Sequence, residues 1–129
     1  MIQYSMFKNT KAFSSFSVDD ISKAKDFYAK VLGINVSEEY GGLTLNLQGS
    51  SVMIYPKDNH EPATFTVLNF TVDDIEKAVD DLTEKGIKFE QYDVADIKTD
   101  EKGISKWEDG PSMAWFVDPA RNIIGLMQK

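Results

Sequence analysis

His60 is the only histidine in the chain, and its imidazole can exchange a proton near neutral pH. It lies in the polar segment KDNHEP, where a lone histidine is typically solvated, so a catalytic role for it is only a secondary hypothesis. The sequence has no cysteine, which excludes thiolate catalysis, disulfides and cysteine-based zinc sites. A single histidine also excludes a two-histidine metal motif within one chain. No Ser-His-Asp arrangement and no glycine-rich phosphate loop can be read from the sequence.

Paired carboxylates occur at three places, Glu38-Glu39, Asp80-Asp81 and Asp100-Glu101. Such pairs can bind cations, but isolated pairs in charged segments are typical of solvated helix faces and turns. We therefore predict solvated surfaces for all three rather than metal sites.

The elements that must position any functional side chain come in two copies. FSVDDISKA at residues 16–24 returns as FTVDDIEKA at residues 70–78, an offset of 54 residues with seven of nine positions identical. In each copy an aspartate precedes an apolar stripe with helical spacing, so Asp19 or Asp20, and Asp73 or Asp74, are candidate helix N-caps. Gly33 and Gly86 are the corresponding stop signals.

Short alternating segments surround each predicted helix. They are expected to form strands at residues 12–18, 34–40, 42–48 and 51–56 in the first half, and at 64–72, 88–93, 113–117 and 122–127 in the second. KDNHEPA at residues 57–63 is a polar connector between the halves. Each half therefore reads as strand, helix and three strands, which predicts an α+β fold with mainly antiparallel pairing. One such unit buries little surface alone, so we expect a single domain over 1–129 with packed modules at about 12–57 and 64–128.

This pattern resembles the vicinal oxygen chelate superfamily, which includes glyoxalase I, extradiol dioxygenases and bleomycin-resistance proteins, and in particular its glyoxalase-like bacterial members. The similarity covers roughly residues 12–128 and is carried by FSVDDISKAKDFYAKVLGINV, FTVDDIEKAVDDLTEKGIKF and MAWFVDPARNIIGLMQ. It implies two βαβββ modules whose curved sheets form a cleft. It also implies four metal-ligand positions, His or Gln on the first strand of each module and Glu on the last.

The inherited ligand positions carry the wrong side chains in this sequence. By this resemblance they fall at Phe13, seven residues before Asp20, at Val67, seven before Asp74, and at Gly125 in the closing strand; the fourth falls at Met53 or Tyr55. A divalent cation needs about three or more N, O or S donors, and Phe, Val and Gly side chains supply none. We therefore predict no metal site and no cofactor.

Strand periodicity then gives the expected lining of the cleft. Alternate residues on the strands are assigned to the cleft and their neighbours to the helix side. Trp107 is added because it lies in the long, weakly patterned stretch 94–112, where such loops are often lids or binding loops or else disordered. Trp115 is instead expected in the core. The predicted cleft residues are Phe13, Ser15, Ser17, Met53, Tyr55, Val67, Asn69, Thr71, Trp107 and Gly125.

Charge and composition limit the class of partner. The net charge of −7 disfavours nucleic acid and anionic membranes, since phosphate groups would be repelled. No apolar run approaches the roughly 18 residues of a membrane span, and the start MIQYSMFKNTK is too polar for a signal peptide. We expect a cytoplasmic protein whose partner is a small organic molecule. The resemblance implies a homodimer, with modules paired within or between chains.

Three functions remain open at this point. The chain binds or sequesters a small molecule without metal, as bleomycin-resistance proteins do. Alternatively it is a lyase, isomerase or dioxygenase-type enzyme with altered metal ligands or none. In the third reading it is a structural module that has lost ligand binding.

Overall fold

The computed structural model describes residues 6–129 and contains two βαβββ units, as the sequence predicts. In the first unit β1 (Ser14–Val18), β2 (Asn35–Glu39), β3 (Gly42–Leu47) and β4 (Ser50–Pro56) form a sheet in the order β1-β4-β3-β2. The β2–β3 and β3–β4 pairs are antiparallel, and β1 pairs parallel with β4. β1 is therefore an edge strand with one side open.

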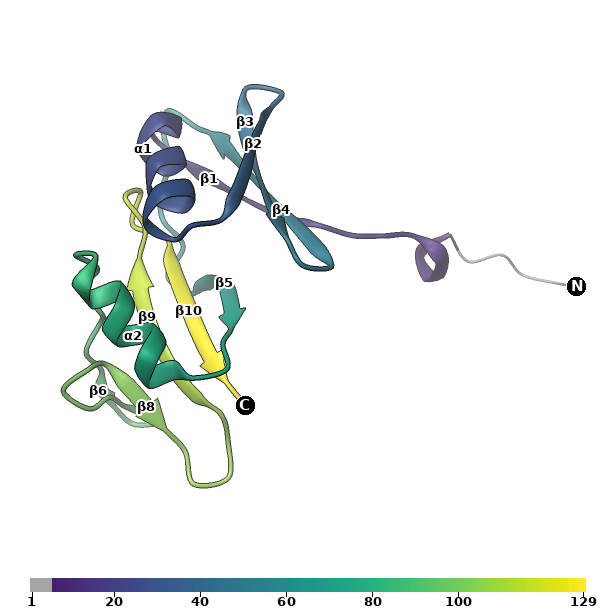
Figure 1. The fold of residues 1–129 in the computed structure, drawn as a ribbon. Helices are drawn as coiled ribbons and strands as arrows, with labels where there is room; N and C mark the ends of the chain where they lie inside the picture. Colours follow the sequence, from purple (N-terminus) through teal and green to yellow (C-terminus); the bar gives the residue numbers. More distant parts are fainter. Residues whose placement is uncertain (1–5) are drawn as a thin grey trace, which may run out of the picture.

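The second unit repeats this arrangement. β5 (Thr66–Thr71), β8 (Ile104–Lys106), β9 (Ser112–Val117) and β10 (Ile123–Gln128) form a sheet in the order β5-β10-β9-β8. β5 pairs parallel with β10 and is again an edge strand, and the other two pairs are antiparallel. A hairpin of β6 (Asp93–Val94) and β7 (Ile97–Lys98) is added between the helix and β8. The two units lie one above the other in Figure 1.

The repeated aspartates cap both helices in the same way. Asp20 accepts a hydrogen bond from the Lys23 N–H at 3.1 Å, and Asp74 accepts one from the Lys77 N–H at 3.1 Å. These contacts satisfy one free donor in the first turn of α1 (Ile21–Lys25) and of α2 (Ile75–Glu84). The repeat therefore specifies the start of each helix.

The first helix departs from the predicted regular α-helix. After Lys25 it continues as the π-helix η2 (Asp26–Val31), in which the Leu32 N–H bonds the Phe27 carbonyl five residues back. Gly33 then ends the segment with a φ of +72°, a conformation that favours glycine. The wider turn belongs to the segment that packs against the second unit.

The predicted strand at residues 88–93 is wrong, because only Asp93 belongs to a strand. Ile87 and Phe89 are buried, and the Phe89 ring lies 5.5 Å from that of Phe116. The alternation of apolar residues in this segment therefore comes from the burial of Ile87 and Phe89 in the core and not from a strand. β8 already occupies the outer edge of β9 as far as Ala114, so this segment makes a single backbone bond to β9, from Glu90 N–H to the Trp115 carbonyl at 2.8 Å.

One apolar core joins the two units. It contains Phe16, Val18 and Ile54 from the first sheet and Phe116 and Ile124 from the second. Phe27 of η2 reaches across to Phe116, with ring centroids 6.2 Å apart. Each unit thus contributes to burying the other, as expected for modules that are each small.

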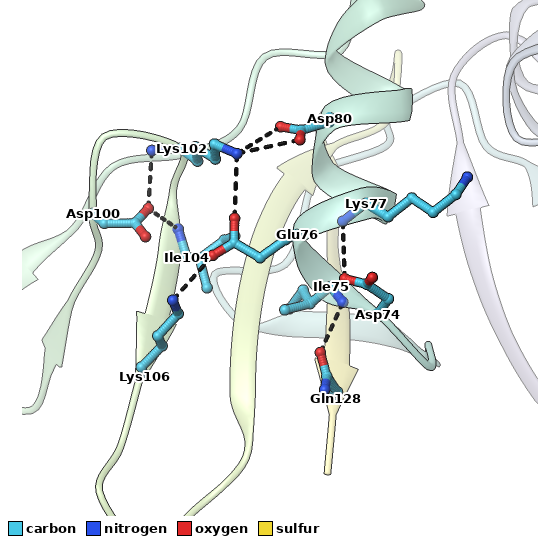
Figure 2. A network of polar contacts seen from close by, with 10 residues as sticks. All are labelled: Asp74, Ile75, Glu76, Lys77, Asp80, Asp100, Lys102, Ile104, Lys106 and Gln128. Atoms are coloured by element: carbon cyan, nitrogen blue, oxygen red, sulfur yellow. Dashed lines mark hydrogen bonds and ion pairs between the residues drawn. The ribbon is translucent and has the colours of Figure 1, made fainter.

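Ion pairs hold the stretch 94–112 against α2, and the charged groups are drawn in Figure 2. Lys102 pairs with Asp80 and Glu76, and Lys106 pairs with Glu76 at 3.0 Å. Asp100 accepts from the N–H groups of Lys102 and Ile104 and closes the turn before β8. Asp80 and Asp100, members of the predicted solvated pairs, therefore serve in surface ion pairs and a turn. Within residues 6–129, no helix is long and apolar enough to cross a membrane.

A second polar contact fixes the start of α2. The side-chain carbonyl of Gln128, at the end of β10, accepts from the Ile75 N–H at 2.8 Å, next to the Asp74 cap. Two free donors of the first turn are thus satisfied from different directions.

Candidate functional site

A pocket of about 370 Å³ lies between the open edges of β1 and β5, beside the connector that joins the two units. We call it the β1–β5 pocket. It is lined by Ser14, Ser15, Phe16, Ser17, Tyr55, His60, Glu61, Ala63, Phe65, Thr66, Val67 and Asn122. Its volume falls within the range of small-molecule sites, and its lining mixes aromatic and aliphatic walls with a few polar groups.

Four of the predicted cleft residues line this pocket: Ser15, Ser17, Tyr55 and Val67. Strand alternation explains the two serines, because Phe16 and Val18 between and after them are buried in the shared core. Tyr55 is the register partner of Ser17 on β4, so both side chains leave the sheet on the same face. Val67 comes from β5 of the other unit.

His60 is hydrogen-bonded on both sides of its ring inside this pocket. Its Nδ1 lies 2.6 Å from the Ser17 Oγ, and its Nε2 lies 3.0 Å from the carbonyl oxygen of Ala120. A carbonyl oxygen can only accept, so Nε2 carries the proton of the neutral ring. Nδ1 then presents its lone pair to Ser17, whose hydroxyl donates. His60 is therefore held by the protein, which the sequence did not predict.

The turn that carries Ala120 is itself fixed by a buried carboxylate. Asp118 is buried, and its Oδ1 accepts from the backbone N–H groups of Ala120 at 2.9 Å and Asn122 at 2.8 Å. Arg121 takes a φ of +69° to complete the turn. Asn122 donates from its side chain both to Asp118 Oδ2 and to the Ser17 carbonyl oxygen. The DPARN segment of the second unit therefore holds β1 of the first.

Tyr28 of η2 completes this network by donating to Asp118 Oδ2 at 2.7 Å. Burial, the charge of Asp118 and the hydrogen bond to it raise the pKa of the Tyr28 hydroxyl far above its ordinary value. Tyr28 therefore remains a neutral donor throughout the physiological range.

Asn69 and Gly125 form a second group on the open face of the second sheet. Asn69, Gly125 and Trp115 are register partners across β5, β10 and β9. A Cβ on Gly125 would meet the Asn69 amide oxygen, so the glycine makes room for this side chain. Trp115 is buried, but it lies outside the shared core and its ring is covered edge-on by Tyr92 at 5.4 Å. Trp115 is therefore buried, as expected, but it packs on the face of the sheet opposite to its neighbours Ala114 and Phe116.

The other predicted cleft residues do not line the β1–β5 pocket. Phe13 is 62% exposed in the segment before β1, next to Gly49 and Ser50. Met53 is the register partner of Ser15, and Thr71 lines an apolar hollow on the helix side with Phe70. Trp107 donates from Nε1 to the Asp96 carbonyl at 3.3 Å and so packs on the β6–β7 hairpin.

The side chains at the inherited metal positions do not fit a divalent cation. Phe13 and Val67 have hydrocarbon side chains, and Gly125, with the amide oxygen of Asn69 beside it, has none. Tyr55, if the fourth position falls there, would be a lone ligand. Across the described part of the chain, no three His, Asp or Glu side chains gather in a way that could hold a metal ion.

Eight residues of the pocket were not predicted as cleft residues: Ser14, Phe16, His60, Glu61, Ala63, Phe65, Thr66 and Asn122. Alternation assigns Ser14 and Phe16 to the helix side, whereas Phe65 and Thr66 lie on the predicted strand 64–72 without an assigned face. Asn122 was visible only as the end of the DPxxN turn motif, and the connector carried no periodicity that assigns a direction to its side chains. The available signals were the position of the connector between the two halves and, for Asn122, the turn motif before the last strand.

Comparisons with known proteins agree with this architecture. The model of the Glyoxalase/Bleomycin resistance protein/Dioxygenase superfamily matches residues 12–92. No curated protein matches the chain significantly.

Among solved structures, a glyoxalase family protein from Bacillus anthracis is 17% identical with a TM-score of 0.71, covering 100% of this chain and 99% of its own. A lactoylglutathione lyase from Agrobacterium tumefaciens is 15% identical with a TM-score of 0.69, covering 93% of each chain. An antibiotic-binding protein from Streptomyces sp. CB03234 is 23% identical with a TM-score of 0.64, covering 93% of this chain and 97% of its own. At these identities the similarity establishes the fold alone.

Proposed function

Because the chain belongs to the Glyoxalase/Bleomycin resistance protein/Dioxygenase superfamily, we propose that it binds a small organic molecule in the β1–β5 pocket without a metal ion. The observation that carries this proposal is the pocket itself, whose lining combines the hydroxyl-bearing residues Ser15, Ser17 and Tyr55 with the apolar residues Phe65 and Val67. Such a lining positions a ligand by hydrogen bonds and binds it through apolar contact.

The charge of the pocket supports a neutral or cationic ligand. Glu61 is the carboxylate of its lining, no lysine or arginine belongs to it, and the whole chain carries a net charge of −7. An anionic ligand would be repelled by this field. For the same reason we propose that the partner is neither nucleic acid nor an anionic membrane. We also propose that the protein acts in the cytoplasm, because a sequence without cysteine fits a reducing compartment.

The relatives support a binding function only by analogy. One of the solved structures of the same fold is an antibiotic-binding protein. The donor-poor side chains at Phe13, Val67 and Gly125 favour binding over metal-dependent catalysis.

A thermal-shift screen of metabolites and antibiotics, with and without divalent metals, tests the proposal. A ligand present at about 100 times its Kd adds about 2.7 kcal/mol to the free energy of unfolding and raises Tm by on the order of 10 °C. Ser15→Ala and Tyr55→Phe should each weaken the hit by roughly 3- to 10-fold through a lost hydrogen bond. Ser22→Ala, on the exposed side of α1, is the matched control and should leave the affinity unchanged.

Two outcomes would contradict the proposal. One is a hit whose affinity is the same in the pocket variants and the control. The other is stoichiometric zinc, nickel, manganese or iron in protein purified without a chelating tag, which would favour the enzyme hypothesis.

We also propose that the protein is a homodimer. The segment of residues 6–13 extends away from both sheets in Figure 1. Its Phe7 is 80% exposed and its Phe13 62% exposed. Large apolar side chains in an extended segment favour burial against another molecule, and a second copy of the chain is the partner proposed here.

A further inference from the structure

The β1–β5 pocket contains a hydroxyl paired with a base, an arrangement that goes beyond ligand binding. The Ser17 Oγ lies 2.6 Å from Nδ1 of His60, and Nε2 of the same ring is oriented by the Ala120 carbonyl at 3.0 Å. A nucleophile bonded to a base, with the base oriented by a third group, is the arrangement that activates serine in covalent catalysis. From this geometry we infer that Ser17 and His60 form a nucleophile–base dyad that hydrolyses small carboxylic esters.

The orientation of the imidazole is what makes the dyad competent. His60 Nε2–H donates its hydrogen bond to the Ala120 carbonyl oxygen, so the lone pair on Nδ1 faces the Ser17 hydroxyl. When Nδ1 takes the Ser17 proton, the ring gains a positive charge that remains bonded to this carbonyl. The carbonyl thus occupies the place that a carboxylate holds in the familiar serine triad.

The backbone of β1 offers a donor for the oxygen that becomes negative during attack. The Val18 carbonyl accepts from the Lys57 N–H, so Val18 directs its backbone groups toward β4. Ser17, one residue earlier, directs its backbone groups to the open edge, and its carbonyl there meets Asn122. Its N–H points to the same edge, where it can bind a developing oxyanion. The phenol of Tyr55, on the same face, is a candidate second donor.

The reaction balances without a cofactor. Ser17 Oγ bonds to the ester carbonyl carbon as its proton passes to His60 Nδ1, and the leaving alcohol oxygen takes that proton as its bond to carbon breaks. Water then attacks the acyl-serine, its proton returns through Nδ1 to Ser17, and the carboxylic acid leaves. The pocket volume of about 370 Å³ and the presence of Glu61 limit the substrate to a small ester that is not anionic.

The inference rests on the proposed pocket, and its test is separate from the ligand screen. The probe is p-nitrophenyl acetate, with release of p-nitrophenol and the mass of intact protein and of its peptides as readouts. The wild type should release p-nitrophenol and carry one acetyl group on Ser17. Ser17→Ala should lose the acetyl group and at least about 100-fold of the protein-dependent rate.

Two further variants separate catalysis from folding. His60→Gln keeps a donor toward the Ala120 carbonyl but removes the base, so it should lose rate and acetylation while unfolding cooperatively like the wild type. Ser22→Ala, outside the pocket, should behave as wild type. Equal rates in wild type and Ser17→Ala, acetylation only at other residues, or full activity of His60→Gln would each overturn the dyad. If ligands still shift Tm in that case, the pocket stands and only its chemistry fails.

Discussion

At the scale of single residues, polar side chains that lie far apart in the sequence join the two repeats. Asp118 accepts from Tyr28, 90 residues earlier, and Asn122 donates to Ser17, 105 residues earlier. Asp118 and Asn122 are both buried, so their polar atoms depend on these protein hydrogen bonds instead of bonds to solvent. Within residues 6–129, no buried side-chain nitrogen or oxygen lacks a hydrogen-bond partner. The junction is therefore a satisfied network, and removing one member should be costly.

Tyr28→Phe tests this cost. The variant leaves Asp118 Oδ2 with Asn122 alone, and the loss of a buried partner should lower the free energy of unfolding by about 1–3 kcal/mol. Urea unfolding at pH 7 measures it. Tyr40→Phe is the control because Tyr40 is 97% exposed, and it should change stability little. A Tyr28→Phe effect no larger than that of the control would contradict the role of the network.

The raised pKa of Tyr28 adds a pH dependence. Below about pH 10 the hydroxyl is protonated in both the folded and unfolded states, whereas above it the unfolded chain ionises and the folded state keeps its proton. Stability should therefore fall as pH rises above about 10, and it should fall less steeply in Tyr28→Phe. Parallel urea titrations of both proteins between pH 8 and 11 measure the difference. Identical slopes would contradict it.

At the scale of elements, two strand glycines allow different close contacts. A Cβ on Gly42 of β3 would meet the backbone oxygen of Ile54, which β4 holds in place. A Cβ on Gly125 of β10 would meet the Asn69 amide oxygen, which lies at the end of an exposed side chain and can rotate away. The first contact strains the sheet, and the second only repositions a side chain.

The two alanine substitutions should therefore differ. Gly42→Ala should cost about 1–3 kcal/mol of unfolding free energy through overpacking. Gly125→Ala should stay within about 1 kcal/mol, since Asn69 can move and alanine reduces the entropy of the unfolded chain. Chemical denaturation of both variants under one condition gives the comparison. Equal losses would show that the Ile54 backbone yields as readily as the Asn69 side chain.

The ion pairs of α2 with the β8 segment are also a property of elements. Hydrogen bonds from Lys106 and then Lys102 lower the pKa of Glu76. A carboxyl group with a lowered pKa stabilises the fold above its unfolded pKa, and this contribution is lost as pH falls through the folded value. All these groups are exposed, so the effect is also weakened by salt.

Glu76→Gln should accordingly lower Tm at neutral pH and low salt. The difference from wild type should shrink as pH falls below about 4 and also as salt is added. Thermal unfolding over pH and ionic strength measures both trends. Glu84→Gln, outside the ion-pair network, is the control. A difference that persists at acid pH would assign the effect to packing instead.

At the scale of the whole molecule, the proposed homodimer is the next feature to measure. The chain has a mass of 14.5 kDa, so light scattering should give about twice this value. A Phe7→Ser, Phe13→Ser double variant should shift the equilibrium toward the monomer, because both apolar side chains are exposed in one copy. A wild type that remains at 14.5 kDa over a range of concentrations would refute the dimer.

The sequence by itself determined the repeated architecture. Asp20 and Asp74 cap the two helices, and alternation separates Phe16 and Val18 from Ser15 and Ser17. These features depend on neighbours a few residues apart, which is the range over which periodicity and capping act. The sequence also showed that Phe13, Val67 and Gly125 have no metal-ligating side-chain atoms, since residue type alone decides whether a side chain can bind a metal.

The tertiary structure decided what meets in the pocket. His60 has no periodic context, and only packing of the 118–122 turn against β1 brings its ring between Ser17 and Ala120. In the same way, Trp115 is buried on the face of its sheet opposite to the shared core, and residues 88–92 form no strand because β8 occupies the edge of β9. These outcomes follow from competition between segments distant in sequence for the same edges and surfaces. Local patterns carry no information about that competition.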